Sequence, residues 1–146
     1  MSARRHRLYF RLQRAAHLVR KSADREMLRR VGITTAQAAV LHLVADRPGL
    51  SQRDLAALLA QNESAMTTMV GRLAGSGLVA RRRSERDGRT WAIELTARGR
   101  EAHAKGRRAF ASINAALDRA LGGPGVPELA ALLDATIDAF SDEPHG

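Results

Sequence analysis

Between Asn62 and Ser76, several hydroxyl-bearing residues and one arginine are spaced so that they would lie on one side of a helix. At about 100° per residue, one side of such a helix holds small or hydrogen-bonding residues: Ser64, Ala65, Thr67, Thr68, Gly71, Arg72 and Gly75. The other side holds apolar residues spaced for burial: Met66, Met69, Val70 and Leu73. Hydroxyl and guanidinium groups hydrogen-bond to the edges of DNA bases. Glycine costs roughly 1 kcal/mol inside a helix but lets another surface come close. The pattern favours a helix that lies against a second molecule; an ordinary solvated helix is the alternative.

The residues before this helix complete a two-helix pattern. Ser51 can cap a helix start, with the Asp54 carboxylate three residues on, and Asn62 is a good cap for the next helix. Two short helices joined by a tight turn form the helix-turn-helix, whose second helix enters the major groove of DNA. We therefore expect the second helix to present Ser64, Ala65, Thr67, Thr68 and Arg72 to base edges or nearby phosphates. The first helix should present Ser51, Gln52 and Arg53 to the DNA backbone.

A basic hairpin is predicted directly after the second helix, which Gly77 can end. Residues 78–83 and 90–95 have the composition of strands, and residues 84–89 that of a turn. Strand alternation places Trp91, Ile93 and Leu95 on one face, and we expect Trp91 to pack beneath the hairpin. The hairpin is rich in arginine: Arg81, Arg82, Arg83, Arg86 and Arg89. A basic hairpin in this place is the wing of a winged helix-turn-helix.

Long amphipathic segments flank this module. One helix is predicted over Arg4–Arg29, a buried helix over Thr35–Asp46, and a third over Thr96–Leu121, with a last helix beginning at Pro127. The outer helices have apolar stripes larger than one small module can cover, which predicts a homodimer. The expected fold is mainly α with a small β wing. It is a single domain over residues 1–146, with a DNA-binding lobe at 33–96 and dimerisation helices at 4–30 and 97–140.

Composition narrows the classes of function. The net charge of +9 favours a polyanionic partner. The chain has no cysteine, which excludes disulfides and thiolate zinc sites. Its five histidines lack metal-ligand spacing, and no catalytic motif occurs, so we expect no metal, no cofactor and no enzyme activity. No apolar run approaches the ~20 residues of a membrane span, and we expect a cytoplasmic protein without a membrane partner.

Several segments together resemble the MarR-type transcriptional regulators. The resemblance is carried by Ile33–Leu41, Pro48–Ala56, Gly77–Val79, Asp87–Arg89, Glu94–Thr96 and Gly99–Arg100. It covers residues 33–100 closely and the flanking helices in general layout. It implies a homodimer that binds double-stranded DNA, acts as a repressor and is released by a small aromatic or anionic ligand.

The resemblance also implies roles for particular residues. Arg89 matches the wing arginine that enters the minor groove, and Asp87 matches the residue that supports the wing. Gly88 departs from the family, in which a second basic residue is common, and Arg86 can compensate. Phosphate contacts are expected from Arg83 and Arg86. The ligand pocket is expected between the first two long helices, with candidate residues Tyr9, Leu12, His17 and His42.

Two other functions remain open at this point. A winged helix can bind a protein partner through its second helix, and the near-neutral face would permit this. A basic protein can also bind nucleic acid by charge alone, without sequence discrimination and with a steep salt dependence.

Overall fold

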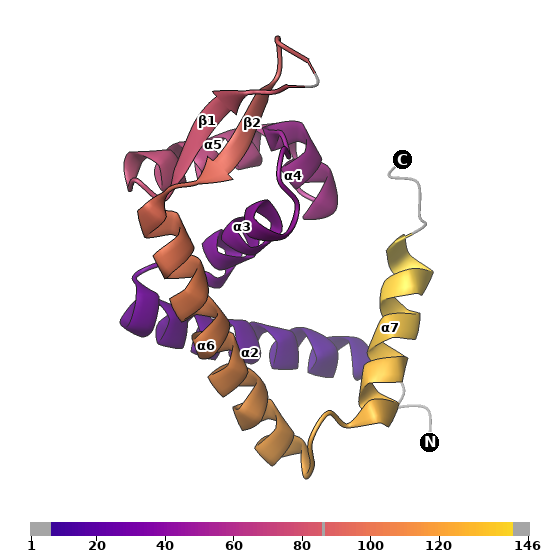
Figure 1. Ribbon diagram of the computed structural model, residues 1–146. Helices are drawn as coiled ribbons and strands as arrows, with labels where there is room; N and C mark the ends of the chain where they lie inside the picture. The colour runs from indigo at the N-terminus through magenta and orange to yellow at the C-terminus, as the bar shows by residue number, and fades with distance from the viewer. Residues whose placement is uncertain (1–6, 86, 142–146) are drawn as a thin grey trace. The chain divides into compact units, whose positions relative to one another are not determined.

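The computed structural model describes residues 7–85 and 87–141. Contacts divide the chain into two units, Met1–Phe110 and Ala111–Gly146, and each is described by itself. The first unit contains most of the elements, in the order α2 (Leu8–Val31), α3 (Thr35–Asp46), α4 (Gln52–Leu58), α5 (Glu63–Gly75), β1 (Val79–Arg83), β2 (Trp91–Leu95) and the start of α6 (Ala97–Leu121) (Figure 1). The second unit contains the rest of α6 and α7 (Pro127–Ser141). The predicted architecture, mainly helical with one small antiparallel sheet, is confirmed.

Side-chain caps fix where the middle helices begin. Thr34 accepts a hydrogen bond from the Gln37 N–H, and Ser51 accepts one from the Asp54 N–H, each within a capping box. Asn62 accepts from the Ala65 N–H at 2.7 Å. Each cap satisfies an N–H that the helix itself leaves unpaired. The predicted starts of α3, α4 and α5 therefore agree with the structure.

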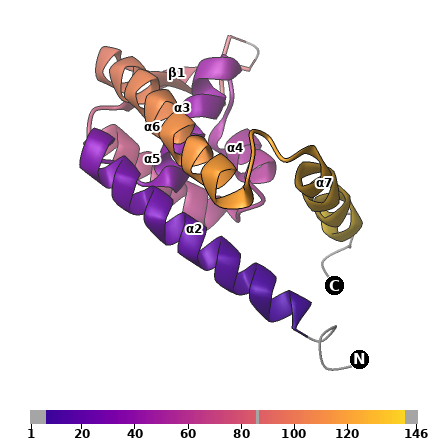
Figure 2. The same cartoon turned by 90° about the horizontal axis from the view of Figure 1, so that it is seen from below.

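The first helix differs from its predicted bounds. It ends at Val31 rather than Arg29, because Gly32 adopts the left-handed conformation (φ 80°) that ends a helix. The predicted start at Arg4 lies outside the described residues. The described part of α2 is exposed up to Ser22, and its N-terminal half runs away from α3, α4 and α5 (Figure 2).

The core lies where α3, α4, α5 and the hairpin meet the C-terminal end of α2 and the first half of α6. Its largest fully buried side chains are Met27, Leu41, Leu55, Met66, Leu73, Ile93, Val40 and Val70. Leu58 lies outside this core, because it stands at the C-terminal end of the short helix α4 and 44% of it is exposed. Within that helix Leu55 and Ala56 supply the buried contacts instead.

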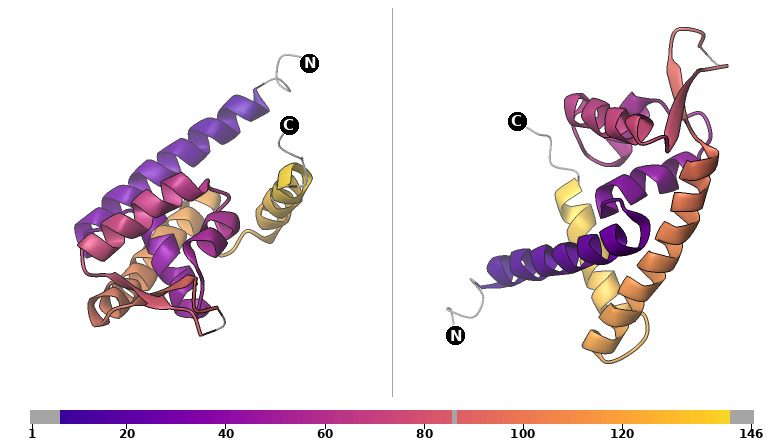
Figure 3. Two further views of the ribbon diagram at one scale, coloured as in Figure 1. Left: turned by 90° about the horizontal axis from the view of Figure 1, so that it is seen from above. Right: turned by 90° about the vertical axis from the view of Figure 1, so that its left-hand side faces the viewer.

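The hairpin pairs β1 with β2 antiparallel, from Val79 opposite Leu95 to Arg83 opposite Trp91. Its tip projects past the neighbouring helices (Figure 3, right). The outer edge of β2 is joined to the loop before α4: Ile93 N–H donates to the Leu50 carbonyl at 2.8 Å. Beside this hydrogen bond, Ser51 and Ala92 form an isolated antiparallel β-bridge.

The start of α6 is held tightly against the hairpin. Thr96 Oγ1 donates to the Gly77 carbonyl at 2.6 Å and accepts from the Gly99 N–H at 3.0 Å. A Cβ on Gly99 would lie 1.9 Å from the Leu78 carbonyl oxygen, so only glycine fits there. A glycine ordinarily weakens a helix, whereas here the fold requires it for this close approach.

Apolar side chains remain exposed on α2 and α7. On α2 they include Leu8 (70%) and Phe10 (69%), and on α7 Leu132 (67%) and Phe140 (72%). Every residue of α7 is at least partly exposed. Among the described residues, no helix is both long enough and apolar enough to cross a membrane.

Candidate nucleic-acid interface

Helix α5 separates its two faces as its sequence predicts. Met66, Val70 and Leu73 are fully buried, and Met69 is half-buried. The opposite face is exposed along its whole length: Ser64, Ala65, Thr67, Thr68, Gly71, Arg72 and Gly75. Within the described chain, a Cβ placed on Gly71 or Gly75 would have nothing within 4 Å. The two glycines therefore leave this face open to another molecule without serving any close contact inside the described chain.

The threonine hydroxyls on this face are oriented by the helix backbone. Thr67 Oγ1 donates to the Glu63 carbonyl at 2.8 Å, and Thr68 Oγ1 donates to the Ser64 carbonyl at 3.3 Å. A hydroxyl that donates its proton in this way still has oxygen lone pairs that can accept. Both side chains thus present acceptors at defined positions on the exposed surface.

Gln52 connects three elements of the interface. Its side-chain N–H donates to Thr67 Oγ1 at 3.1 Å, and its oxygen accepts from the Arg81 guanidinium at 3.1 Å and 3.4 Å. Gln52 lies in α4, Thr67 in α5 and Arg81 in β1. The amide therefore ties the wing to both helices of the helix-turn-helix. From the sequence we expected Gln52 at the DNA backbone and no specific contact for Arg81. Strand alternation was the only local pattern that bore on where the Arg81 side chain lies.

Ser51 and Arg53 lie at the start of α4. The Ser51 hydroxyl accepts from Asp54 N–H at 3.1 Å and so holds the helix start. The Arg53 guanidinium lies 3.5 Å from the Glu63 carboxylate, with the two side chains 86% and 70% exposed. An ion pair this exposed is worth little, so Arg53 can exchange it for a phosphate at small cost.

The turn of the hairpin is built around Asp87. Its carboxylate accepts from the Arg89 N–H at 3.0 Å and from the Thr90 hydroxyl at 3.1 Å. An aspartate that bonds to its own turn in this way stabilises the turn conformation. The carbonyl of Gly88 accepts from the Arg83 guanidinium at 3.1 Å. Arg89 is exposed on this turn, and the expected contribution of Arg86 lies outside the described residues.

Trp91 is not buried beneath the hairpin as expected. Half of the residue is exposed, and the Arg83 guanidinium lies 5.4 Å from the centre of its ring. The prediction is wrong because Trp91 lies at the end of β2 nearest the turn, beyond the core; on the strand face that it shares with Ile93 and Leu95, only Ile93 is fully buried. The exposed ring instead attracts the Arg83 guanidinium on the surface of the wing.

The candidate ligand-binding residues are spread over two helices. Tyr9, Leu12 and His17 are exposed on α2, and His42 is exposed on α3. The ring of His42 lies 5.6 Å from that of His103, on α6. Burial first, then His42 and Arg107, lower the pKa of His103 below its ordinary value. The spacing of the histidines in the sequence does not predict this pair. In residues 7–85 and 87–141, no group of three or more potential metal ligands is found.

Comparisons with known proteins agree with this geometry. A family model described as "MarR family" matches residues 31–90. The chain is 36% identical over 98 residues to the HTH-type transcriptional repressor Rv2887 of Mycobacterium tuberculosis, covering 67% of this chain and 68% of the relative. The structure resembles that of the S. aureus MepR–DNA complex, with a TM-score of 0.80 and 21% identity, over 91% of this chain and 97% of MepR.

A second solved structure is that of the PcaV transcriptional regulator of Streptomyces coelicolor in complex with its natural ligand. It has a TM-score of 0.72 and 27% identity, over 92% of this chain and 90% of PcaV. The identity and coverage of the mycobacterial relative, together with the matched family model, establish that this chain belongs to the MarR family.

Proposed function

We propose that the protein is a sequence-specific DNA-binding repressor. The observation that carries the proposal is the exposed, nearly uncharged face of α5 beside an arginine-rich hairpin. Base edges are read by hydrogen bonds and apolar contacts, while phosphate contacts position the protein. The neutral helix and the basic wing supply these two kinds of contact separately. Rv2887, named a repressor, and MepR, solved with DNA, support the assignment.

We propose the following roles for individual residues. Ser64, Thr67, Thr68 and Arg72 face base edges or adjacent phosphates, with Ala65 beside them for apolar contact. Ser51, Gln52 and Arg53 approach the DNA backbone at the start of α4. On the wing, Arg83 and Arg86 bind phosphates, and Arg89 enters the minor groove from a turn that Asp87 holds in shape.

We further propose that the protein acts as a homodimer. The exposed apolar side chains of α2 and α7 form surfaces that monomeric proteins seldom leave open to water. Two-fold symmetry then predicts a pseudo-palindromic operator with half-sites about one helical turn apart. Light scattering should give the mass of a dimer at micromolar concentration; a stable folded monomer would contradict this part of the proposal.

A small aromatic or anionic effector completes the proposal. PcaV, the solved relative with its natural ligand, supports it, and the candidate residues are Tyr9, Leu12, His17 and His42. An effector that favours one spacing of the two reading helices opposes DNA binding by its coupling energy, typically ~1–3 kcal/mol. A titration of phenols and aromatic acids into the protein–operator complex tests this, with His17→Ala and His42→Ala as variants. If no compound weakens DNA binding and neither variant changes it, this part of the proposal is overturned.

The central experiment measures binding to the gene's own upstream region and to random DNA of equal length. A sequence-specific regulator prefers the upstream DNA, a protein held by charge alone binds both equally, and a protein-interaction module binds neither. A reporter driven by the bound promoter should rise when the gene is deleted if the protein is a repressor.

Two arginine variants then distinguish recognition of DNA bases by α5 from phosphate contacts made by the wing. Arg72→Ala should cost roughly 1–3 kcal/mol and change sequence preference if the side chain reads guanine. Arg83→Ala should weaken all sequences alike and reduce the salt slope by about one unit. If both variants weakened all sequences equally, the division between the α5 face and the wing would be wrong.

A further inference from the structure

The hydroxyl group of Thr67 forms hydrogen bonds within the protein as a donor and as an acceptor. It donates its proton to the Glu63 carbonyl at 2.8 Å, in the preceding turn of α5. It also accepts the side-chain N–H of Gln52, from α4, at 3.1 Å. A hydroxyl has one proton and two lone pairs, so the proton and one lone pair are already used. Little of its hydrogen-bonding capacity is left for a DNA base.

The side-chain amide of Gln52 has only one orientation that suits both of its neighbours. Its oxygen accepts from the Arg81 guanidinium at 3.1 Å and 3.4 Å, and a guanidinium can only donate. The amide N–H groups must therefore face Thr67, which supplies the acceptor. This contact holds the Thr67 oxygen toward Gln52. The methyl group, which forms no hydrogen bonds, is the remaining part of this exposed side chain.

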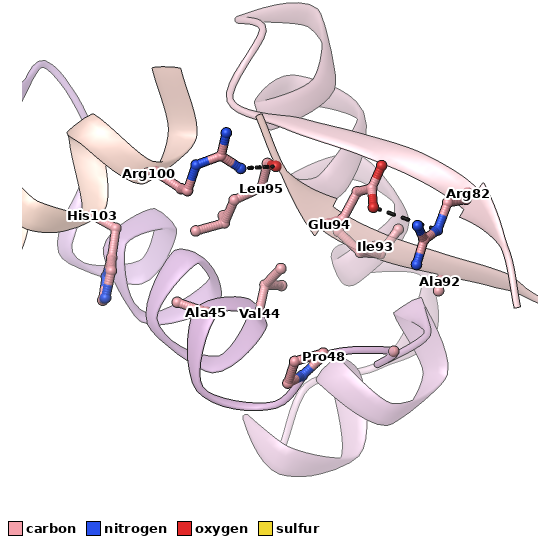
Figure 4. A pocket seen from close by; sticks show the side chains of 11 residues that line it. Val44, Ala45, Pro48, Arg82, Ala92, Ile93, Glu94, Leu95, Arg100 and His103 are labelled. Carbon is pink, nitrogen blue, oxygen red and sulfur yellow. Dashed lines mark hydrogen bonds and ion pairs between the residues drawn. The ribbon is translucent and has the colours of Figure 1, made fainter. Parts of the chain in front are cut away.

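The alternation of β1 decides which arginine reaches Gln52. Successive residues of a strand point to opposite faces. On one face Arg82 pairs with Glu94 at 3.5 Å, beside a pocket at the base of the hairpin (Figure 4). Arg81 therefore lies on the other face, where it holds the Gln52 amide. The orientation of Thr67 thus depends on three elements, α4, α5 and the hairpin.

We propose that Thr67 recognises a thymine through its methyl group and that Gln52 is the positioning residue for this contact; the inference rests on the proposed DNA-binding function. In the major groove thymine presents a C5-methyl group, with which a threonine methyl makes apolar contact. Thr67 lies in the N-terminal half of α5, and this end of a recognition helix contacts base edges. Each half-site of the operator then contains one thymine that cytosine, which has no such methyl group, does not replace.

A threonine that reads bases through its hydroxyl would behave differently. Such a hydroxyl can bond to any of the bases, and the contact does not depend on the thymine methyl. Thr68 is the better candidate for that role. In the described part of the chain its hydroxyl has one hydrogen bond, a longer one of 3.3 Å to the Ser64 carbonyl, and no side chain from α4 holds it. The two adjacent threonines therefore provide a matched comparison.

The test measures binding of the full-length protein to its operator by fluorescence anisotropy. Each thymine of a half-site is replaced in turn by uracil, which lacks only the C5-methyl group. At one position in each half-site the replacement should weaken binding roughly fourfold, the factor expected for burial of one methyl group. If no replacement of thymine by uracil weakens binding, the proposal is overturned.

Three variants assign the uracil penalty to one methyl group. Thr67→Ser keeps the hydroxyl and removes the methyl group, so the uracil replacement should no longer weaken binding. Thr67→Val keeps a methyl group and removes the hydroxyl, so the penalty should persist. Thr68→Ser, the same change at the next position, should leave the penalty at this thymine unchanged. A penalty that survives in Thr67→Ser would mean that another group, such as Ala65, contacts the thymine, and would overturn the assignment.

Gln52→Ala tests the positioning role. Without the amide, the Thr67 hydroxyl is held only by the Glu63 carbonyl, and the uracil penalty should fall to about twofold or less. Arg53→Ala is the matched control, because this neighbouring side chain pairs with Glu63 and not with Thr67. It should weaken binding to the thymine and uracil operators alike. A purely structural role of Gln52 would also lower both affinities by one factor, so an unchanged penalty in Gln52→Ala would overturn the positioning role.

The same titrations distinguish this inference from the function on which it rests. If the protein prefers its operator to random DNA but shows no uracil penalty that depends on Thr67, the proposed function stands and recognition of thymine by Thr67 fails. If the protein prefers no DNA sequence, both fail.

Discussion

Replacing Gly99 by alanine should destabilise the protein although alanine is the better helix former. The added Cβ would lie 1.9 Å from the Leu78 carbonyl oxygen and 3.4 Å from the Leu95 Cβ. A Cβ atom essentially never lies within 3.0 Å of a non-bonded heavy atom, so the backbone must move by roughly an ångström. The Leu78 carbonyl also accepts from the Thr96 N–H at 3.1 Å, so this movement disturbs the hydrogen bond that holds α6 to the hairpin.

The magnitude follows from three opposing effects. Overpacking typically costs about 1–3 kcal/mol, and the weakened hydrogen bond up to about 1 kcal/mol more. The helical preference of alanine offsets up to about 1 kcal/mol. Because the last two effects are similar in size and opposite in sign, they nearly cancel, and the expected net loss in the free energy of unfolding is about 1–3 kcal/mol.

Gly106 provides the matched control in the same helix, about two turns further on. A Cβ there would lie 3.8 Å from Met27 Sδ and 4.0 Å from Ala38 Cβ, which are ordinary contacts. Gly106→Ala should therefore stabilise the fold by up to about 1 kcal/mol. Urea denaturation at one fixed protein concentration measures both variants, because the proposed dimerisation would make apparent stability depend on concentration. If Gly99→Ala were as stable as Gly106→Ala, the close approach of α6 to the hairpin would be refuted.

Three further outcomes are expected. Gly71→Ala should raise stability by up to about 1 kcal/mol yet weaken operator binding, because the added methyl group projects from the exposed face of α5. Denaturation measures the first effect and fluorescence anisotropy the second, and tighter DNA binding would contradict the prediction. Gln52→Ala and Arg81→Ala should be non-additive in DNA affinity by at least about 0.5 kcal/mol, since the two side chains are bonded; additive losses in a double-mutant cycle would mean that they act separately. Hydrogen bonds from the Thr35 hydroxyl, and then from the Thr35 N–H, hold the pKa of Asp24 below its usual 3.8. The ionised carboxylate therefore stabilises the fold above pH 3.8, and this contribution is lost as the pH falls through the lowered pKa. Asp24→Asn should therefore make the loss of stability in acid shallower in pH-dependent denaturation, and an unchanged acid limb would argue against the Asp24–Thr35 contact.

The sequence by itself determined the order and starts of the main elements. Thr34, Ser51 and Asn62 each cap a helix through a bond to a residue three positions on, so their effect is decided locally. The two faces of α5 follow from the helical period alone. The Asp87 turn is equally local, because it bonds to the next two or three residues.

Tertiary structure decided which distant groups meet. Gln52 reaches Arg81, His42 faces His103, and Gly99 lies against Leu78 only because separate elements pack together. The same cause explains the exposure of Trp91, whose apolar character predicts burial while its position beyond the core prevents it. The pocket at the base of the hairpin likewise has walls from α3, β2 and α6, and no local pattern encodes a space enclosed by segments far apart in the chain.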